Sequence, residues 1–261
     1  NISLSNQLEF LTVSINENVI ENNQLKFEIN ISEEERKFYV NRISIFGNSI
    51  TEETVIRNQL IVDEGDPLNN LLFNKSLNYI EGLNLFASVR GRVVDSNVEG
   101  KKDIEIAVEE KATGELSAGA GVGTSGGAIR FGIKERNYLG KGITLDAGLD
   151  LNEESIKGNI NYYNPNYKNS DKSLLFGISS TNTDRLAEYG YKSSDSRFHL
   201  GTGYQQYDDF YLKPSFSVSY DKVETSNTAS DNLKKQKGDY FTTNFSYEID
   251  YDKRNQKFQP S

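Results

Sequence analysis

The stretch ISIFGNSITEETVIRNQLIVDEGD, Ile43 to Asp66, joins an alternating apolar strand to a Gly-Asn stop and an amphipathic segment that ends at Glu-Gly-Asp. Thr51 stands where a helix N-cap is expected, and the two glutamates after it suit the first turn of a helix. The Glu-Gly-Asp sequence breaks the chain, and Pro67 fits the first position of a second helix. The stretch therefore predicts one strand followed by two helices.

The sequence on either side extends this unit. Two alternating segments, FASVRGRVVD and DIEIAVEEK, follow the second helical stretch, and the hairpin-like SNVEGKK separates them. Together these elements predict a compact α+β domain over residues 38–112 with the order β-α-α-β-β. Residues 1–37 hold two further strand-like runs, and we expect them to form the last hairpin of a preceding domain.

The composition of the chain changes near residue 113, and the remainder alternates between apolar and polar residues in eight segments with a period of two. Charged residues such as Arg130, Asp146 and Lys157 lie mid-strand on the polar face, and Tyr and Phe gather near strand ends. Transmembrane barrels combine a polar interior with aromatic girdles at both membrane interfaces. Residues 113–261 are therefore predicted to form part of an antiparallel transmembrane β-barrel, about eight strands. A soluble β-domain also alternates and is the other possibility.

Several classes of function are disfavoured by the composition. The 261 residues carry a net charge of -9 and show no basic stripe, which argues against a nucleic-acid partner. The chain has no cysteine, and its one histidine, His199, falls on the polar face of a strand, so no metal site is expected. Neither a nucleophile elbow nor a Walker loop is found. We expect no catalytic residue, no cofactor and no enzyme activity.

Three stretches resemble one known family. The sequence FYVNRISIFGNSITEETVIRNQLIVDEGDPLN, continued by SLNYIEGLNLFASV, is similar to the last POTRA (polypeptide-transport-associated) domain of the BamA family of outer-membrane β-barrel assembly proteins. The stretch VEEKATGELSAGAGVGTSGGAIRFGIKERNYLGKGITL resembles the start of the barrel in that family. YEIDYDKRNQKFQPS resembles the turn that follows a middle strand of the barrel. The resemblance covers about residues 8–261.

The resemblance implies a location and a set of partners. The POTRA domain would lie in the periplasm and the barrel in the bacterial outer membrane. The partners would be unfolded outer-membrane proteins, accessory lipoproteins of the BamD type and outer-membrane lipid. The activity would be the folding and insertion of β-barrel clients, without catalysis in the chemical sense.

The resemblance also implies a partner-binding surface on the POTRA domain. In the family, the glutamate that matches Glu64 is tied to docking the BamD lipoprotein, and the arginine that matches Arg57 lies on the same surface. The Glu-Gly-Asp corner, completed by Gly65 and Asp66, would then face the partner. The alternative is that Glu64 is a helix-end charge in solvent.

A second implied site is the first barrel strand. In the family this strand forms one side of a lateral gate, a weak seam at which an incoming strand pairs. Small residues and glycine leave little to pack, which suits a weak seam. The alternative is that the glycines face a crowded barrel interior. The residues of the predicted gate strand are Glu115, Leu116, Ser117, Ala118, Gly119, Ala120, Gly121, Val122 and Gly123.

Two further points stay open. A two-partner secretion transporter or a TamA-type translocation protein shares the same outline, so export of a client through the barrel is the alternative function. The chain contains no methionine, even at position 1, and it opens on a hairpin without the rest of its domain. We therefore expect a piece of a longer protein, with further POTRA domains before it and further strands after it.

Overall fold

The computed structural model describes residues 11–20, 24–33, 38–123, 126–207 and 209–252. The chain forms two compact units. The first contains Asn1–Ser49 and Gln59–Glu110, and the second contains Ile50–Asn58 and Lys111–Ser261. The polypeptide therefore passes from one unit to the other three times.

The first unit begins with a two-stranded antiparallel hairpin, β1 (Leu11–Ile20) and β2 (Gln24–Glu33). Ile15 stands opposite Ile29 in its register, and both side chains are exposed. Residues 1–10, 21–23 and 34–37 lie outside the described part of the chain. The origin of this hairpin in a preceding POTRA domain stays a prediction.

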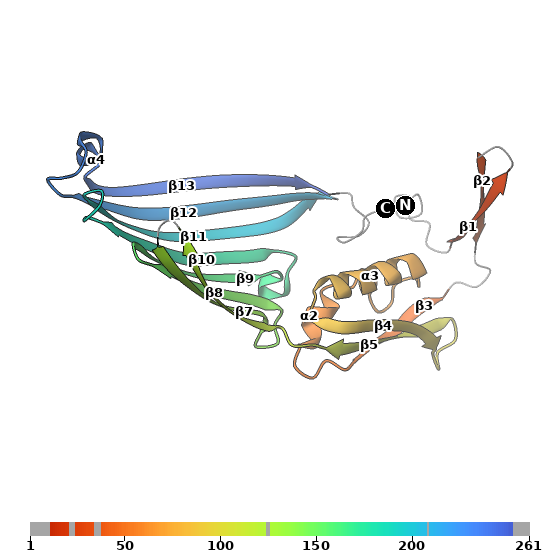
Figure 1. Cartoon of the computed structure of the whole chain (residues 1–261). Helices are drawn as coiled ribbons and strands as arrows, with labels where there is room; N and C mark the ends of the chain where they lie inside the picture. The colour runs from red at the N-terminus through yellow and green to blue at the C-terminus, as the bar shows by residue number, and fades with distance from the viewer. Residues whose placement is uncertain (1–10, 21–23, 34–37, 124–125, 208, 253–261) are drawn as a thin grey trace. The chain divides into compact units, whose positions relative to one another are not determined.

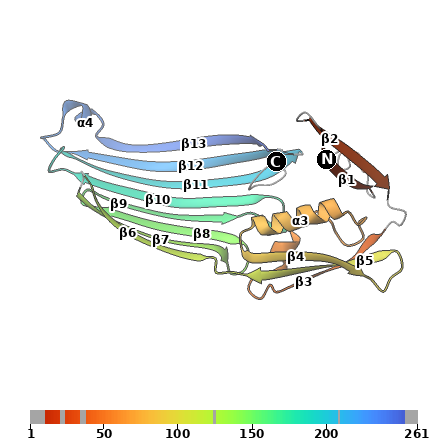
Figure 2. The same ribbon diagram turned by 45° about the vertical axis from the view of Figure 1, so that its right-hand side comes forward.

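The rest of the first unit is a three-stranded sheet with a helix. The strands are β3 (Tyr39–Phe46), β4 (Phe86–Asp95) and β5 (Lys101–Glu110), in the spatial order β3-β5-β4. The central strand β5 runs parallel to β3 and antiparallel to β4. Helix α3 (Asn70–Gly82) lies along the sheet (Figure 2). With the short helix α2 (Glu53–Arg57), the chain order is β-α-α-β-β, which confirms the predicted domain class.

Alternating residues of β3 and β5 point into the core of the first unit. Ile43, Ile104 and Ile106 are almost fully buried, and α3 contributes Phe73 and Ile80 to the same core. Gly91 on β4 allows the close packing, because a Cβ atom at this position would lie 2.5 Å from Cζ of Phe73 and 2.7 Å from Cδ1 of Leu77. Burial of such side chains contributes about 1.5–3 kcal/mol each to stability.

The predicted helix starts are wrong at both helices. Helix α3 begins at Asn70, and the side chain of Asn69 caps it by accepting from the backbone N–H groups of Leu71 and Leu72, 2.9 and 3.2 Å away. Pro67 lies before the helix, in an isolated bridge with Tyr39. Helix α2 begins at Glu53 with Glu52 at its N-cap position. Thr51 lies one position before the N-cap, and its hydroxyl oxygen accepts a hydrogen bond from Asn137 at 2.9 Å.

The second unit is built on one eight-stranded antiparallel sheet, which confirms the predicted number of strands (Figure 1). Consecutive strands are neighbours, so the spatial order is β13-β12-β11-β10-β9-β8-β7-β6. The strands are β6 (Gly114–Gly123), β7 (Gly126–Tyr138), β8 (Ile143–Asn152), β9 (Ser155–Asn164), β10 (Ser173–Arg185), β11 (Tyr191–Tyr207), β12 (Phe210–Thr225) and β13 (Gly238–Tyr251). Two short helices lie in connections, η1 (Tyr167–Asn169) and α4 (Asp231–Lys235). Residues 253–261, including most of the predicted turn sequence, lie outside the described chain.

The two faces of this sheet differ in chemistry. One cross-strand row on the apolar face consists of Ile178, Ile160, Ala147, Ile133 and Leu116, each opposite the next in the ladder. The large members of the row are exposed. Contiguous exposed apolar surface of this extent marks a membrane or protein contact. No helix in the described residues is long and apolar enough to cross a membrane.

Candidate functional site

Strand β6, the predicted gate strand, forms one edge of the eight-stranded sheet. Among the described strands it pairs only with β7, in a register from Gly114 opposite Glu135 to Gly123 opposite Gly126. Every residue of β6 is exposed. On its other side β6 has no partner among the described residues, and the backbone N–H and C=O groups of such an edge can pair with another strand.

Three of the four glycines of β6 are not required by crowding from the described chain. A Cβ atom added at Gly119, Gly121 or Gly123 would meet nothing within 4 Å. Glycines of interior strands differ, since a Cβ at Gly148 would lie 2.6 Å from Oδ1 of Asn159 and one at Gly177 would lie 2.3 Å from Cε1 of His199. Gly148 and Gly177 make room for polar side chains, whereas Gly119, Gly121 and Gly123 leave an edge with little side-chain surface.

The polar face of the sheet carries charges in pairs. Arg130 on β7 bonds to Asp150 on β8, and Nζ of Lys213 on β12 lies 2.7 Å from Oε1 of Glu248 on β13. These groups are exposed, so each pair adds little to stability. Paired charges on an accessible polar face fit a wet barrel interior, as the sequence predicted.

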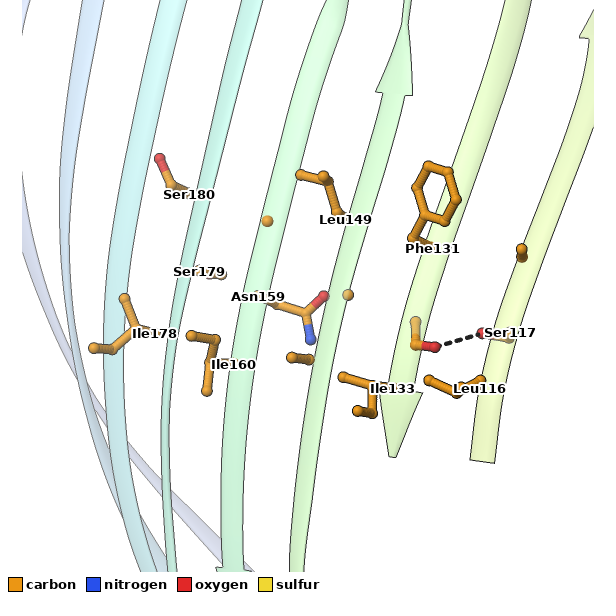
Figure 3. Close-up of a pocket in the computed structure, with 15 residues that line it drawn as sticks. Leu116, Ser117, Phe131, Ile133, Leu149, Asn159, Ile160, Ile178, Ser179 and Ser180 are labelled. Atoms are coloured by element: carbon orange, nitrogen blue, oxygen red, sulfur yellow. Dashed lines mark hydrogen bonds between the residues drawn. The ribbon is translucent and has the colours of Figure 1, made fainter. Parts of the chain in front are cut away.

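A groove of about 810 Å³ crosses β6 to β10 (Figure 3). Phe131, Leu149 and Ile160 contribute large side chains to its lining, as Figure 3 shows, and the lining also includes small residues such as Ala147 and Gly158. The lining is almost wholly apolar and continues the apolar face of the sheet. We treat the groove as part of that face and assign it no ligand.

The edge of β3 in the first unit is covered by the Glu-Gly-Asp corner. The backbone N–H of Gly65 donates to the carbonyl of Val40, and the N–H of Val40 donates to the carbonyl of Asp66, each at 2.8 Å. Oε1 of Glu64 accepts from the backbone N–H of Ile43 at 2.9 Å. The corner is thus held against β3 by three hydrogen bonds, although its own side chains are exposed.

The four predicted partner-binding residues do not fall in one unit. Arg57 belongs to the second unit and bonds through Nε to Oε1 of Glu53, 2.6 Å away on the same helix. Glu64, Gly65 and Asp66 belong to the first unit. Oδ2 of Asp66 accepts from the N–H of Asp63 at 2.8 Å, which closes the corner on itself. A shared surface of Arg57 and Glu64 stays a prediction.

The opposite edge of the three-stranded sheet is β4, whose only neighbour among the described strands is β5. Exposed arginines lie along it, and Arg92 bonds to Glu105 of β5 at 2.5 Å. At its far end the ammonium group of Lys102 bonds to Asp95 and lowers the pKa of that carboxyl group. Because residues 64–68 cover β3, β4 is the edge of this sheet that can accept an extended segment.

The sequence interpretation missed one pair of buried polar residues. Thr51 and Asn137 are 3% and 8% exposed, and they bond to each other within the second unit. The signal was the NYLGKG sequence at the end of β7, whose glycines indicate positive φ angles. The described residues contain no group of three or more carboxylate or histidine side chains that could hold a metal ion.

Two family models match this chain. Residues 38–111 match a POTRA model, described as a surface antigen variable number repeat, and residues 137–261 match the Omp85 superfamily domain. The chain is 26% identical over 230 residues to the outer membrane protein assembly factor BamA of Neorickettsia risticii, covering 86% of this chain and 31% of that protein. It is 27% identical over 145 residues to BamA of Neisseria meningitidis, covering 55% of this chain and 18% of that protein. The chain thus spans less than a third of these relatives.

Solved structures show the same fold. The crystal structure of BamA from Haemophilus ducreyi lacking POTRA domains 1–3 superimposes with a TM-score of 0.66 at 20% identity, covering 96% of this chain and 51% of that one. CdiB from Acinetobacter baumannii gives a TM-score of 0.54 at 12% identity, covering 93% and 47%. The eight-stranded sheet therefore has the fold of part of a BamA barrel.

Proposed function

Because this chain belongs to the Omp85 superfamily, with a POTRA domain followed by part of an Omp85 barrel, we propose that it takes part in assembling outer-membrane β-barrel proteins. Members of this family are non-enzymatic assembly factors that reside in the bacterial outer membrane with their POTRA domains in the periplasm. The BamA proteins of Neorickettsia risticii and Neisseria meningitidis are assembly factors by title. The proposed clients are unfolded barrel proteins. The apolar face of the sheet would contact outer-membrane lipid.

The observation that carries the proposal is the run of small residues on β6, which is the outermost strand of the described sheet. An unfolded client strand can add to this edge through backbone hydrogen bonds alone. Unpaired backbone groups in lipid cost several kcal/mol each, so an open edge at membrane depth has a strong tendency to gain a partner. Pairing at β6 would give a client its first strand register inside the bilayer.

The two outermost strands of the described sheet differ in composition, in a way that favours β6 for transient pairing. Strand β13 exposes large side chains, Phe241, Phe245 and Ile249, that can pack against a neighbouring strand. Cross-strand pairs of this kind contribute roughly 0.2–1 kcal/mol each. Strand β6 exposes mainly glycine, alanine and serine, so a partner on β6 gains few side-chain contacts and can be released.

We assign the POTRA domain a docking role at two places. The open edge of β4 suits an extended client segment. The exposed corner of Glu64, Gly65 and Asp66 suits an accessory lipoprotein of the BamD type, for which Arg57 would supply a charge of opposite sign. The support for the corner is its exposure together with the family resemblance.

Cysteine crosslinking in the full-length gene product tests the gate assignment, because these 261 residues contain no cysteine of their own. We expect Ala120→Cys, on β6, to form a disulfide with a cysteine in the first or last strand of a stalled barrel client. Ala147→Cys is the matched control, since it lies on β8, two strands or about 10 Å from the edge. Equal crosslinking at both positions would remove β6 as the client site.

Depletion of the full-length protein in its host tests the function as a whole. We expect a general loss of outer-membrane barrels. Normal barrel levels with the loss of one exported protein would replace assembly with two-partner secretion or TamA-type translocation.

A further inference from the structure

The connection between β7 and β8 is a tight turn of unusual backbone geometry. Leu139, Gly140 and Gly142 all have positive φ angles, 57°, 74° and 63°. The N–H of Gly140 donates to the carbonyl of Asn137 at 3.0 Å, and the N–H of Gly142 donates to Oδ1 of Asn137 at 2.8 Å. Asn137 therefore closes the turn with both its backbone and its side chain.

A break in the ladder allows Asn137 to do this. The β7–β8 register shifts between Glu135 and Tyr138, so Asn137 has no residue opposite it on β8. Its backbone N–H donates to Oε1 of Glu135 at 2.6 Å, and the same carboxylate accepts from the hydroxyl of Thr113, just before β6. Bulges of this kind re-aim a side chain away from the sheet.

The side chain of Asn137 is aimed at the segment Ile50–Asn58. Its Nδ2 donates to Oγ1 of Thr51 at 2.9 Å, and the backbone N–H of Glu52 donates to the carbonyl of Gly140 at 2.8 Å. The amide of Asn137 thus bonds the turn through its oxygen and the segment through its nitrogen. Buried amides that use both ends are costly to disrupt, because each lost partner leaves a buried polar group unsatisfied.

The fit between turn and segment is also steric. A Cβ atom at Gly140 would lie 2.1 Å from the carbonyl oxygen of Ile50, and one at Gly142 would lie 3.0 Å from Cγ1 of Val55. The segment therefore sits against the backbone of the turn, at positions where a side chain would push it away. Val55 and Thr51 are both buried.

The segment that contacts the turn comes from another part of the sequence than the strands with which it packs. Ile50–Asn58 lies inside the stretch 38–111 that matches the POTRA model, yet it packs as part of the second unit with the barrel strands. We propose that Asn137 is a positioning residue and that residues 137–142 form a socket that holds Ile50–Val55 in place while the protein works. The socket would give the proposed assembly function a fixed attachment of POTRA sequence at the β7–β8 turn.

The test uses the full-length protein in outer-membrane fragments. Glu52 and Lys141 flank the socket, and their charged atoms lie 4.0 Å apart at exposed positions. We expect zero-length carbodiimide crosslinking to join these two native residues, as seen by mass spectrometry, and hydrogen exchange at the Glu52 and Gly142 amides to be slow. Asn137→Ala should lower the crosslink yield several-fold and speed exchange at both amides about tenfold or more, as expected for the loss of two buried hydrogen bonds.

Two further variants separate the socket from general loss of structure. Asn161→Ala is the matched control, because Asn161 donates to Asp146 at 3.1 Å on the same sheet, away from the segment. It should leave crosslinking and exchange at Glu52 unchanged. Thr51→Val should copy Asn137→Ala, and Thr51→Ser should restore the wild-type values. An Asn137→Ala protein with wild-type crosslinking and exchange at Glu52 would overturn the socket, whatever depletion shows about barrel assembly.

Discussion

The carboxylate of Glu64 accepts a hydrogen bond from the backbone N–H of Ile43, 2.9 Å away. A side chain thereby takes the place of a strand partner at the edge of β3. The same residue is exposed and is the one that the family resemblance assigns to a lipoprotein partner. Structural and partner-binding roles can be separated by chemistry, because the hydrogen bond needs an oxygen and a charge-dependent partner needs the negative charge.

Glu64→Gln keeps an oxygen acceptor, so we expect the free energy of unfolding to change by less than about 0.5 kcal/mol, whereas Glu64→Ala should lower it by about 1 kcal/mol. Co-purification of the full-length protein with its lipoprotein should fail for both variants if the partner recognises the negative charge of Glu64. Retention of the lipoprotein by Glu64→Gln would show that binding does not depend on the negative charge of Glu64.

Small side chains on β6 should matter for function and not for folding. Gly119→Val and Gly121→Val meet open space, so the protein should fold and reach the membrane at wild-type levels. A β-branched residue strengthens strand pairing, by up to about 1 kcal/mol per site, and should slow the release of a paired client. Outer-membrane barrel levels and the amount of stalled client, measured by semi-native gels, check this.

The control for these variants is Gly148→Val on β8. Its side chain would collide with Asn159, so this variant should lower the amount of folded protein itself. Wild-type barrel levels in both β6 variants would contradict a role for the small side chains.

Gly140 and Gly100 share a φ angle of 74° but differ in their surroundings. A Cβ at Gly140 would meet the carbonyl oxygen of Ile50 at 2.1 Å, and one at Gly100 would meet nothing within 4 Å. Gly100→Ala should therefore cost only the backbone penalty, about 1–2 kcal/mol. Gly140→Ala should cost distinctly more and should expose the Glu52 amide to hydrogen exchange. Equal effects of the two substitutions on thermal stability and on hydrogen exchange at the Glu52 amide would argue against close packing of Ile50–Asn58 on the turn.

Ser76 supplies a further test of the first unit. It is almost fully buried on α3, its hydroxyl donates to the carbonyl of Leu72, and it accepts from the N–H of Ile61 at 2.8 Å. Ser76→Ala leaves a backbone N–H without its partner, so we expect a loss of about 1–3 kcal/mol in unfolding free energy. Chemical denaturation of the full-length protein, followed by hydrogen exchange at Ile61, measures the loss. A neutral Ser76→Ala would mean that Ile61 gains another acceptor.

Local patterns account for what could be predicted from the sequence. Alternation with a period of two depends only on neighbouring residues, so all eight barrel strands and the order of the POTRA elements were predictable. The helix starts were not predictable. Thr51 bonds to a residue 86 positions away, and α3 begins at Asn70, with Asn69 as its cap, and not at Pro67. The hydrogen bond from Ile43 to Glu64 likewise spans 21 residues. Sequence patterns indicate which residues are buried or polar, but the partner of a polar side chain is set by the folded chain.

The packing of Ile50–Asn58 with the barrel strands has a consequence for recombination. A chimaera that exchanges POTRA domains at residue 111 brings a foreign version of this segment to the resident turn at 137–142. A residue at position 51 or 55 that does not fit the turn would then impair the hybrid protein, even though the exchanged POTRA domain is itself folded. Natural or engineered hybrids should therefore work best when residues 50–58 and 137–142 come from the same parent, and these two short stretches should change together when related genes diverge.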